Sequence, residues 1–433
     1  MRSLTPHIGG KLNRVTALAV GHCLTIDFLI DMNPGIDALL NRARKVRDDL
    51  SLPAAAKVES RRDRRVATLN DPGIETSVAA ALDWLGAAQD NSVSNDGGIA
   101  RDYSLVSGWR ASYPETSGYI VPTLLRGHPG RANDASRERA RAVLDWLVSI
   151  QLEGGGFQGG VIGQTPVVPV TFNTGQILIG LASGVRELGE YYRPSMIAAA
   201  DWLVRTQDED GAWRKNPTPF AKAGEKAYET HVAWGLLEAA RVDPSRGYAE
   251  AAQRNIEWAL TKQRVNGWFA DCCLNDSSRP LTHTIGYVLR GVIEGYRFSH
   301  DESLLDASLV TARGVMSALR TNGFLPGRLN PDWTGAVRWA CLTGSVQIAH
   351  CWLLLHQMTG NAEFLDAAKR TNAYVRARVR VEGEPELRGG VKGSFPVDGE
   401  YGQFEYLSWA CKFFIDANLL EQEISASTGG AGA

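Results

Sequence analysis

The pattern that decides the fold is clearest in the run Trp202-Leu203-Val204-Arg205-Thr206-Gln207-Asp208-Glu209-Asp210-Gly211-Ala212-Trp213. A tryptophan is followed five residues later by a glutamine, and a glycine-containing break then leads to a second aromatic residue. The same register recurs three more times, at Trp84 and Gln89, at Trp146 and Gln151, and at Trp258 and Gln263. The four tryptophans are 62, 56 and 56 residues apart, and self-similarity at a nearly fixed period indicates a repeat architecture.

Two further copies of the unit are degenerate and bring the number of units to six. One leads from residues 317–320 into a break at 322–324, and the other leads from 368–381 into breaks at 389–390 and 393–395. No run with the alternation of a β-strand competes with this helical reading.

Each unit is expected to contain two helices. The first is amphipathic, as in residues 135–151 and 196–207, and ends at glycine. The second is apolar nearly all round, and a helix that is apolar on every face has to be buried. These second segments are 120–125, 175–182, 232–240, 285–293, 346–355 and 404–420. Half-exposed helices alternating with buried ones predict an all-α fold, an (α/α)6 toroid of six helical hairpins.

The toroid is expected to occupy residues 73–421. Residues 1–72 are predicted to form an N-terminal helical extension with a linker at 53–65, and residues 422–433 a flexible C-terminal tail.

Composition limits the classes of partner. The 433 residues carry a net charge of −2, without the basic surplus of a nucleic-acid-binding protein. The apolar stretch at 15–29 is too short for a membrane span, is interrupted by His22, Cys23 and Asp27, and is not followed by a cleavage site. Six cysteines are too few for a disulfide scaffold of this length. We therefore predict a cytoplasmic protein with no nucleic-acid partner and no membrane insertion, and leave the oligomeric state open.

The tryptophan–glutamine pattern resembles the QW repeat of terpenoid cyclases and protein prenyltransferases. The resemblance implies a toroid, in which glutamine and tryptophan staple an outer helix to the turn that follows it. The six-hairpin layout is similar to that of the (α/α)6 glycosidases, polysaccharide lyases and uronyl epimerases. The segments 112–119 and 280–284 also resemble toroid proteins of bacterial exopolysaccharide biosynthesis. These resemblances imply a carbohydrate-active enzyme that acts on an oligo- or polysaccharide.

A polar residue begins each predicted inner helix. These markers are Glu115, Asn173, His231, His283, Thr343 and Glu405, spaced 58, 58, 52, 60 and 62 residues apart. In a toroid, six such points lie round one mouth of the barrel. Threonines at these places, namely Thr116, Thr174, Thr230, Thr282 and Thr343, are expected helix N-caps. Buried carboxyl, amide and imidazole groups cost free energy unless they pair or bind something, so the ring predicts a functional pocket.

Two chemistries compete for this pocket. Hydrolysis by paired carboxylates is favoured, with Glu115, Glu229 and Glu405 as candidates. The alternative is a uronate lyase or C5-epimerase, which needs His or Tyr as acid and base and an amide or guanidinium for the substrate carboxylate. Its candidates are Tyr113, Tyr228, His231 and His283 with Asn173 and Arg338. The full set of predicted substrate-binding residues is Asn173, Trp109, Tyr228, Trp268, Arg338, Trp339 and Tyr406.

Two other functions and a metal site are alternatives to these chemistries. A terpenoid cyclase would need an acidic motif, and the nearest match, Asp208-Glu209-Asp210, lies where the repeat needs a turn. Zinc could be held by members of the set Asp271, Cys272, Cys273, His283, Cys341 and His350. The adjacency of two of these cysteines is not typical ligand spacing, so neither a metal nor another cofactor is predicted. A non-catalytic glycan-binding protein remains the last alternative.

Overall fold

The computed structural model describes residues 51–65, 69–130, 133–219 and 221–429. The chain divides into two compact units, residues 1–58 and residues 59–433. Most of the predicted N-terminal extension, together with Cys23, therefore lies outside the described residues. Within the described ranges no helix is long and apolar enough to cross a bilayer.

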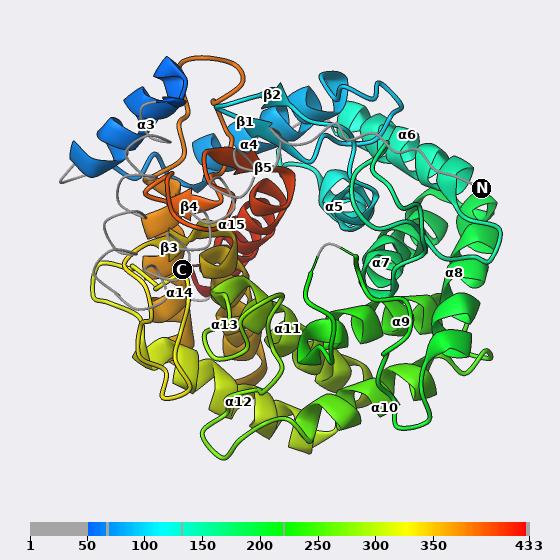
Figure 1. Cartoon of the computed structure of the whole chain (residues 1–433). Coiled ribbons are helices and arrows are strands. Elements are labelled where there is room, and N and C mark those ends of the chain that lie inside the picture. The colour runs from blue at the N-terminus through cyan, green and yellow to red at the C-terminus, as the bar shows by residue number, and fades with distance from the viewer. Residues whose placement is uncertain (1–50, 66–68, 131–132, 220, 430–433) are drawn as a thin grey trace, which may run out of the picture. The chain divides into compact units, whose positions relative to one another are not determined.

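The second unit consists mainly of two concentric rings of helices (Figure 1). The outer ring contains α4 (Ile74–Asp90), α6 (Asp134–Ile150), α8 (Arg193–Thr206), α10 (Tyr248–Leu260), α12 (Glu302–Ser317) and α14 (Ala362–Arg376). The inner ring contains α5 (Pro114–Arg126), α7 (Thr171–Leu188), α9 (Thr230–Val242), α11 (Thr282–Ser299), α13 (Leu342–Thr359) and α15 (Ser408–Gly429). Each inner helix packs on the next, and α15 packs on α5 to close the circle. The predicted toroid of six helical hairpins is confirmed.

Glycines allow the inner helices to approach one another closely. A Cβ on Gly118 of α5 would lie 2.5 Å from Cα of Ile177 in α7. A Cβ on Gly235 of α9 would lie 2.3 Å from the carbonyl oxygen of Gly175 in α7. Because both obstacles are backbone atoms, a side chain at either position would force the helices apart.

The repeated glutamine joins consecutive units. Gln207 Nε2 donates to the carbonyl of Gly211, 3.0 Å away in the following turn, and to that of Ala251, 2.8 Å away in the next outer helix. Gln89 and Gln151 make the equivalent pairs of bonds. The glutamine part of the expected staple is therefore confirmed.

The tryptophan part of the staple is confirmed at the end of the pattern, where Trp213 Nε1 donates to the Leu203 carbonyl of α8 at 2.9 Å. The tryptophan that precedes the glutamine packs instead against the turn of the preceding unit. Trp202 covers Gly156, and Trp84 covers Gly390. Glycine is needed in these turns because any side chain would collide with the indole ring. Trp84 Nε1 also donates to the Glu386 carbonyl at 2.8 Å, which joins the first unit to the last.

The glutamine clasp gives a testable stability effect. We expect Gln207→Ala to lower the free energy of unfolding by about 1–3 kcal/mol, because it removes the donor to two backbone carbonyls. The measurement is urea unfolding followed by circular dichroism. The control is Gln403→Ala, an exposed glutamine with one 3.2 Å bond to the Asp398 carbonyl, for which a change within about 0.5 kcal/mol is expected. Equal effects of the two substitutions would contradict the clasp.

Short strands replace the expected start of the last inner helix. β1 (Asp102–Ser104) pairs antiparallel with β2 (Gly108–Trp109) on one side and with β5 (Glu405–Leu407) on the other. A second pair joins β3 (Ala340–Cys341) to β4 (Ser394–Phe395). A short apolar run fits a buried strand as well as a buried helix, which is why the prediction of helix from residue 404 failed.

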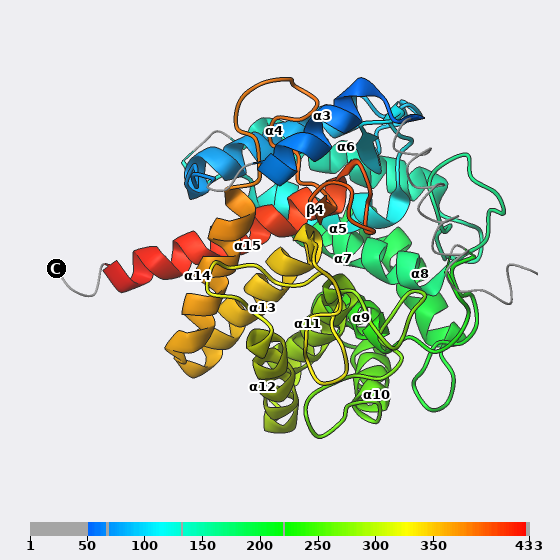
Figure 2. The same cartoon turned by 60° about the vertical axis from the view of Figure 1, so that its left-hand side comes forward.

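Two other boundaries differ from expectation. The predicted linker at 53–65 is helical, since α3 covers Ala54–Arg65, and its alanines and long charged side chains are good helix formers. The flexible tail predicted from residue 422 is also helical, because α15 continues to Gly429 (Figure 2). Two short 3-10 helices, η1 (Glu190–Tyr192) and η2 (Ala227–Glu229), complete the described elements.

Candidate active site

A cavity of about 350 Å³ opens at the mouth where the inner helices begin. Glu115, Asn173 and His283 reach it from the first turns of α5, α7 and α11. Its other polar and aromatic lining residues include Arg101, Tyr113, Tyr119, Gln164, Phe172, Tyr228, Tyr287, Tyr401 and Trp409. The predicted pocket at this mouth is therefore present. Thr343 begins α13 as expected but does not line it.

Glu115 is the buried acid of the cavity. Tyr113 Oη donates to Glu115 Oε2 at 2.5 Å. Burial raises the pKa of Glu115 to about 7, although the hydrogen bond from Tyr113 and the charge of Arg101 act in the opposite direction. At neutral pH both protonation states are populated, so this carboxyl can donate or accept a proton.

Tyr113 and Asn173 flank the carboxyl. Burial, together with the neighbouring Glu115, raises the pKa of Tyr113 well above that of free tyrosine, so the phenol stays protonated. The Asn173 amide lies close to this phenol, and its buried Nδ2 has no hydrogen-bond partner of good geometry among the described residues. An unsatisfied buried amide beside a cavity is a donor available to a ligand.

His283 is a neutral base facing the same cavity. Its Nδ1 lies 2.5 Å from Gln347 Oε1, which can only accept, so Nδ1 carries the proton and Nε2 has a free lone pair. Burial lowers the pKa of His283 to about 4, so the ring is neutral at pH 7. The rings of Tyr287 and Tyr401 pack against the His283 imidazole, at centroid distances of 4.4 and 5.2 Å.

Three predicted catalytic residues do not line the cavity. His231 is buried against Trp234 and Tyr287, with Nδ1 2.6 Å from Gln176 Oε1. Glu229 is buried in η2, where desolvation raises its pKa well above the ordinary value. Glu405 lies in β5, and its Oε2 is 3.1 Å from Arg101 Nη1. Glu229 and Glu405 thus lie outside the inner helices, whereas His231 is the second residue of α9, as Glu115 is of α5, but its ring is held by Gln176 of α7.

Several lining residues were missed as site candidates. Tyr119 and Tyr287 lie four residues after Glu115 and His283, and i, i+4 positions share one face of a helix. That spacing could have identified them. The sequence predicts Glu405 at the start of the last inner helix. In the structure Trp409, the second residue of α15, lines the cavity from that position.

Aromatic rings form much of the cavity wall. Phe172 lies 5.3 Å from Tyr228 and 5.1 Å from Tyr287 between centroids. Trp409 Nε1 donates to Tyr401 Oη at 2.8 Å, and Arg101 lies over the Trp409 ring at 5.3 Å. Tyr228 is thus found where a substrate-binding role was predicted.

The other predicted substrate-binding residues lie elsewhere. Trp109 packs on Trp84 and Tyr103, Trp268 packs on Trp333, and Tyr406 is buried within β5. Arg338 lines a separate cavity, and Trp339 packs over Gly327. These residues lie in loops and in the short strands β2 and β5, whose course the repeat does not determine.

The threonines beside the markers are not side-chain N-caps. Tyr113 and Val170 occupy the N-cap positions of α5 and α7 without a side-chain bond. Thr174 Oγ1 donates to the Val170 carbonyl at 2.8 Å, and Thr230 Oγ1 donates to the Val288 carbonyl at 3.1 Å. These two hydroxyl groups therefore donate to backbone carbonyls, and the Val288 carbonyl lies on a neighbouring inner helix, α11.

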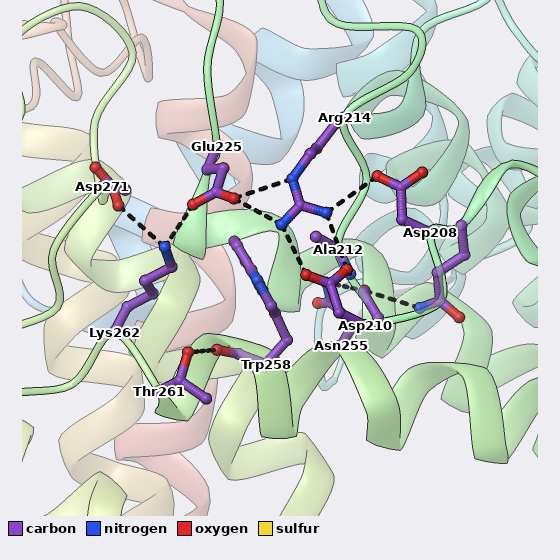
Figure 3. A network of polar contacts seen from close by, with 12 residues as sticks. Asp208, Asp210, Ala212, Arg214, Glu225, Asn255, Trp258, Thr261, Lys262 and Asp271 are labelled. Carbon is purple, nitrogen blue, oxygen red and sulfur yellow. Dashed lines mark hydrogen bonds and ion pairs between the residues drawn. The ribbon is translucent and has the colours of Figure 1, made fainter.

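The Asp208-Glu209-Asp210 segment forms the predicted turn. Arg214 pairs with Asp208, Asp210 and Glu225 (Figure 3). Hydrogen bonds from Arg214 lower the pKa of Asp210 to about 2, so this group is ionised and unsuited to protonating an alkene. Among the described residues no group of three or more His, Cys, Asp and Glu side chains gathers as metal ligands.

Fold and cavity together define an (α/α)6 toroid with a polar, aromatic-lined cavity at one mouth. No family model matches the chain. An unsaturated glucuronyl hydrolase specific for heparin superposes with a TM-score of 0.66 at 14% identity, covering 82% of this chain and 98% of that one. An unsaturated glucuronyl hydrolase from Bacillus sp. GL1 gives 0.62 at 16% identity, with coverages of 81% and 98%.

A curated sequence is also similar to part of the chain. The squalene–hopene cyclase of Zymomonas mobilis is 24% identical over 226 residues, which are 46% of this chain and 32% of that protein. The chain thus spans about a third of the length of this relative. At these identities the similarities establish the toroid fold and leave the activity to be argued from the cavity.

Proposed function

We propose that the chain is a carbohydrate-active enzyme, a hydrolase that acts on a glycoside of an acidic sugar in the cytoplasm. The observation that carries the proposal is the buried Glu115, hydrogen-bonded to Tyr113 in an aromatic-lined cavity, with its pKa near 7. The cavity volume is within the range of small-ligand sites. Five described cysteines, all free and buried, support the proposed compartment.

The cavity favours hydrolysis with a single carboxyl group. Among its described lining residues Glu115 is the one carboxylate, so the predicted carboxylate pair is not assembled there. The names of the similar hydrolases specify an unsaturated glucuronyl group. When the double bond of such a sugar lies between C4 and C5, the ring contains an enol ether. Protonation of its C4 and addition of water at C5 give a hemiketal that opens and releases the attached sugar. Glu115 can supply the first proton and then recover one from the attacking water.

Two polar groups are placed to bind the uronate carboxylate. The Asn173 amide has an unsatisfied donor, and the Arg101 guanidinium lines the same cavity. Arg101 is already paired with Asp102 and Glu405, which fixes its position beside Trp409. Donors of this kind orient an anionic sugar ring against the aromatic wall.

A lyase or C5-epimerase is the second candidate. It is favoured by the neutral His283, whose Nε2 can accept a proton, in the same cavity as the Tyr113 phenol. Abstraction of the proton next to a uronate carboxylate needs such a base and an acid on the sugar.

One assay separates these chemistries. The protein is incubated in D2O with a 4,5-unsaturated uronyl disaccharide and, separately, with saturated uronate oligosaccharides. The proposed hydrolase removes the ultraviolet absorbance of the conjugated double bond and releases a reducing sugar. A gain of absorbance from the saturated substrate would indicate a lyase, and deuterium at C5 without an absorbance change an epimerase. Binding without turnover of either substrate would overturn the enzymatic proposal and leave a glycan-binding protein.

The pKa of Glu115 predicts the pH profile. Because the reacting carboxyl must be protonated, kcat/KM is expected to fall above about pH 7. Tyr113→Phe removes a hydrogen bond that stabilises the ionised form, so the pKa rises and the falling limb moves to higher pH. The measurement is kcat/KM from pH 5 to 9 for both proteins. A limb that stays in place, or that moves to lower pH, would contradict this role of Glu115.

A further inference from the structure

A second cavity, of about 480 Å³, lies farther along the inner helices and is called the distal cavity here. Its basic lining residues are Arg126, Arg186, Arg290, Arg297, Lys412 and His350. Tyr119 borders both this cavity and the one at the mouth. Apart from Tyr119, no residue of the distal cavity lines the proposed active site.

Positive charge exceeds negative charge around the distal cavity. Five Arg or Lys residues line it, against the three acids Glu238, Asp416 and Glu423. A fourth acid, Glu294, lies 2.7 Å from Arg290 and 2.8 Å from Arg297. One carboxylate is therefore shared between two guanidinium groups. Arg126 pairs with Glu423, Arg186 with Glu238 and Lys412 with Asp416, so the excess positive charge lies at Arg290 and Arg297, where a bound anion offsets it.

Lys412 is the most deeply buried of these cations, with 3% of its surface exposed. Asp416 Oδ2 accepts from its ammonium group at 2.7 Å, and the rings of Phe413 and Tyr119 lie 4.4 and 5.7 Å away. An ammonium group has three N–H donors, and among the described residues Asp416 is the one ion-pair partner of Lys412. Burial lowers the pKa of Lys412.

His350 provides a second donor. Arg290 Nη1 lies 3.2 Å from His350 Nδ1, and a guanidinium only donates, so Nδ1 accepts and Nε2 carries the proton. Burial and the charges of Arg290 and Lys412 lower the pKa of His350 well below the ordinary value, so the ring stays in this neutral form. Lys412, Arg290 and His350 therefore all present N–H groups in one cavity.

Helix ends explain only part of this charge. Cations near the last turn of a helix are stabilised by its terminal carbonyls, which suits Arg126, Arg186 and Arg297. Lys412 lies in the second turn of α15, and Arg290 lies midway along α11. The helix dipole falls off within the last turn and does not account for these two residues.

We propose that the distal cavity is a second ligand site, which binds the oxyanion group of a small molecule between Lys412, Arg290 and His350. A phosphate, a sulfate ester and a carboxylate share the required chemistry, and the source is decided by titration. Arg290 stacks over Trp234 at 4.3 Å, which fixes the guanidinium in place before the ligand arrives.

The test is isothermal titration calorimetry of the full chain with inorganic phosphate, sulfate, glucose 6-phosphate and glucuronate, with glucose as the neutral probe. We expect at least one anion to bind and glucose not to compete with it. Lys412→Met and Arg290→Gln are each expected to weaken that binding about tenfold or more, because a charge-assisted hydrogen bond is lost. The matched control is Arg193→Gln, an arginine paired with Glu190 on the outer ring, which should bind the anion as the wild type does.

Two further variants keep the test decisive. If Lys412→Met does not fold, a second variant, Arg297→Gln, can be used, because the Arg297 side chain is 44% exposed. This variant should weaken anion binding several-fold. Asn173→Ala removes a proposed uronate donor from the mouth cavity and should leave anion affinity at the distal cavity unchanged, which separates the two sites. The proposal is overturned if no anion binds the wild type, or if the distal substitutions leave affinity unchanged.

Discussion

Glu115→Gln is expected to lower kcat on an acidic glycoside about 10²- to 10⁴-fold, the usual contribution of a positioned acid or base. Glutamine has nearly the shape of glutamic acid and can still accept the hydrogen bond from Tyr113, but it cannot transfer the proton. KM should change little, because the amide preserves the shape of the cavity. The measurement is steady-state kinetics with the substrate that the wild type consumes.

The matched control is Glu187→Gln, an exposed acid near the end of α7 that faces Arg137 at 3.8 Å. It should retain wild-type kcat and KM. Circular dichroism of both variants checks that the fold is kept. If Glu115→Gln retains full turnover while folded, Glu115 is not the reacting carboxyl.

Lys392→Met is expected to lower the free energy of unfolding by about 3–5 kcal/mol, because breaking a buried ion pair leaves uncompensated charge. Lys392 Nζ lies 2.5 Å from Glu59 Oε1 and 2.5 Å from Asp63 Oδ1, and all three residues are buried. Arg380 still pairs with Glu59 in the variant, whereas the hydrogen bond to Asp63 from the Val397 amide is all that remains to that carboxylate.

The loss of unfolding free energy caused by Lys392→Met should depend on pH. Burial already raises the pKa of Asp63, and without the Lys392 charge that pKa rises further above its value in the unfolded chain. The folded variant then binds more protons than the unfolded chain at mildly acidic pH, so its deficit shrinks as the pH falls. Urea unfolding at pH 8 and pH 5 measures this change. Lys215→Met, an exposed lysine paired with Asp208, is the control and should change stability by less than about 0.5 kcal/mol. A Lys392→Met deficit that is no larger than the control's would contradict the buried triad.

The architecture could be predicted because its determinants are local and repeated. Gln207 binds a carbonyl four residues ahead, and in the turns beyond Gln89 and Gln151 a glycine, Gly98 or Gly156, leaves room for the tryptophan ring of the next unit. Five of the six marker residues, from Glu115 to Thr343, lie in the first turns of inner helices as predicted. The repeat thus determines which end of each inner helix faces the mouth.

The composition of the cavity could be predicted only in part, because the loops that shape it are not repeated. Glu115, Asn173 and His283 were predicted from their places at the inner-helix starts and line the cavity, as do Tyr113 and Tyr228, which were predicted from the aromatic residues of the same loops. Trp109, Trp268, Arg338, Trp339 and Tyr406 were assigned from loop proximity along the chain, and none of them does.

The sixth marker residue, Glu405, shows the same limit of sequence-based prediction in the last unit. Pairing of β5 with β1 turns Glu405 toward Arg101 and places Trp409 at the helix start instead. This pairing joins segments about three hundred residues apart, which no local pattern reveals.

A crystal structure of the Glu115→Gln protein with a 4,5-unsaturated uronyl disaccharide tests the central claim most directly. The account predicts the unsaturated ring in the mouth cavity, with C4 beside the side chain of residue 115 and its carboxylate within hydrogen-bond distance of Asn173 or Arg101. A sugar bound only in the distal cavity or on the outer ring, with the mouth cavity empty, would contradict it.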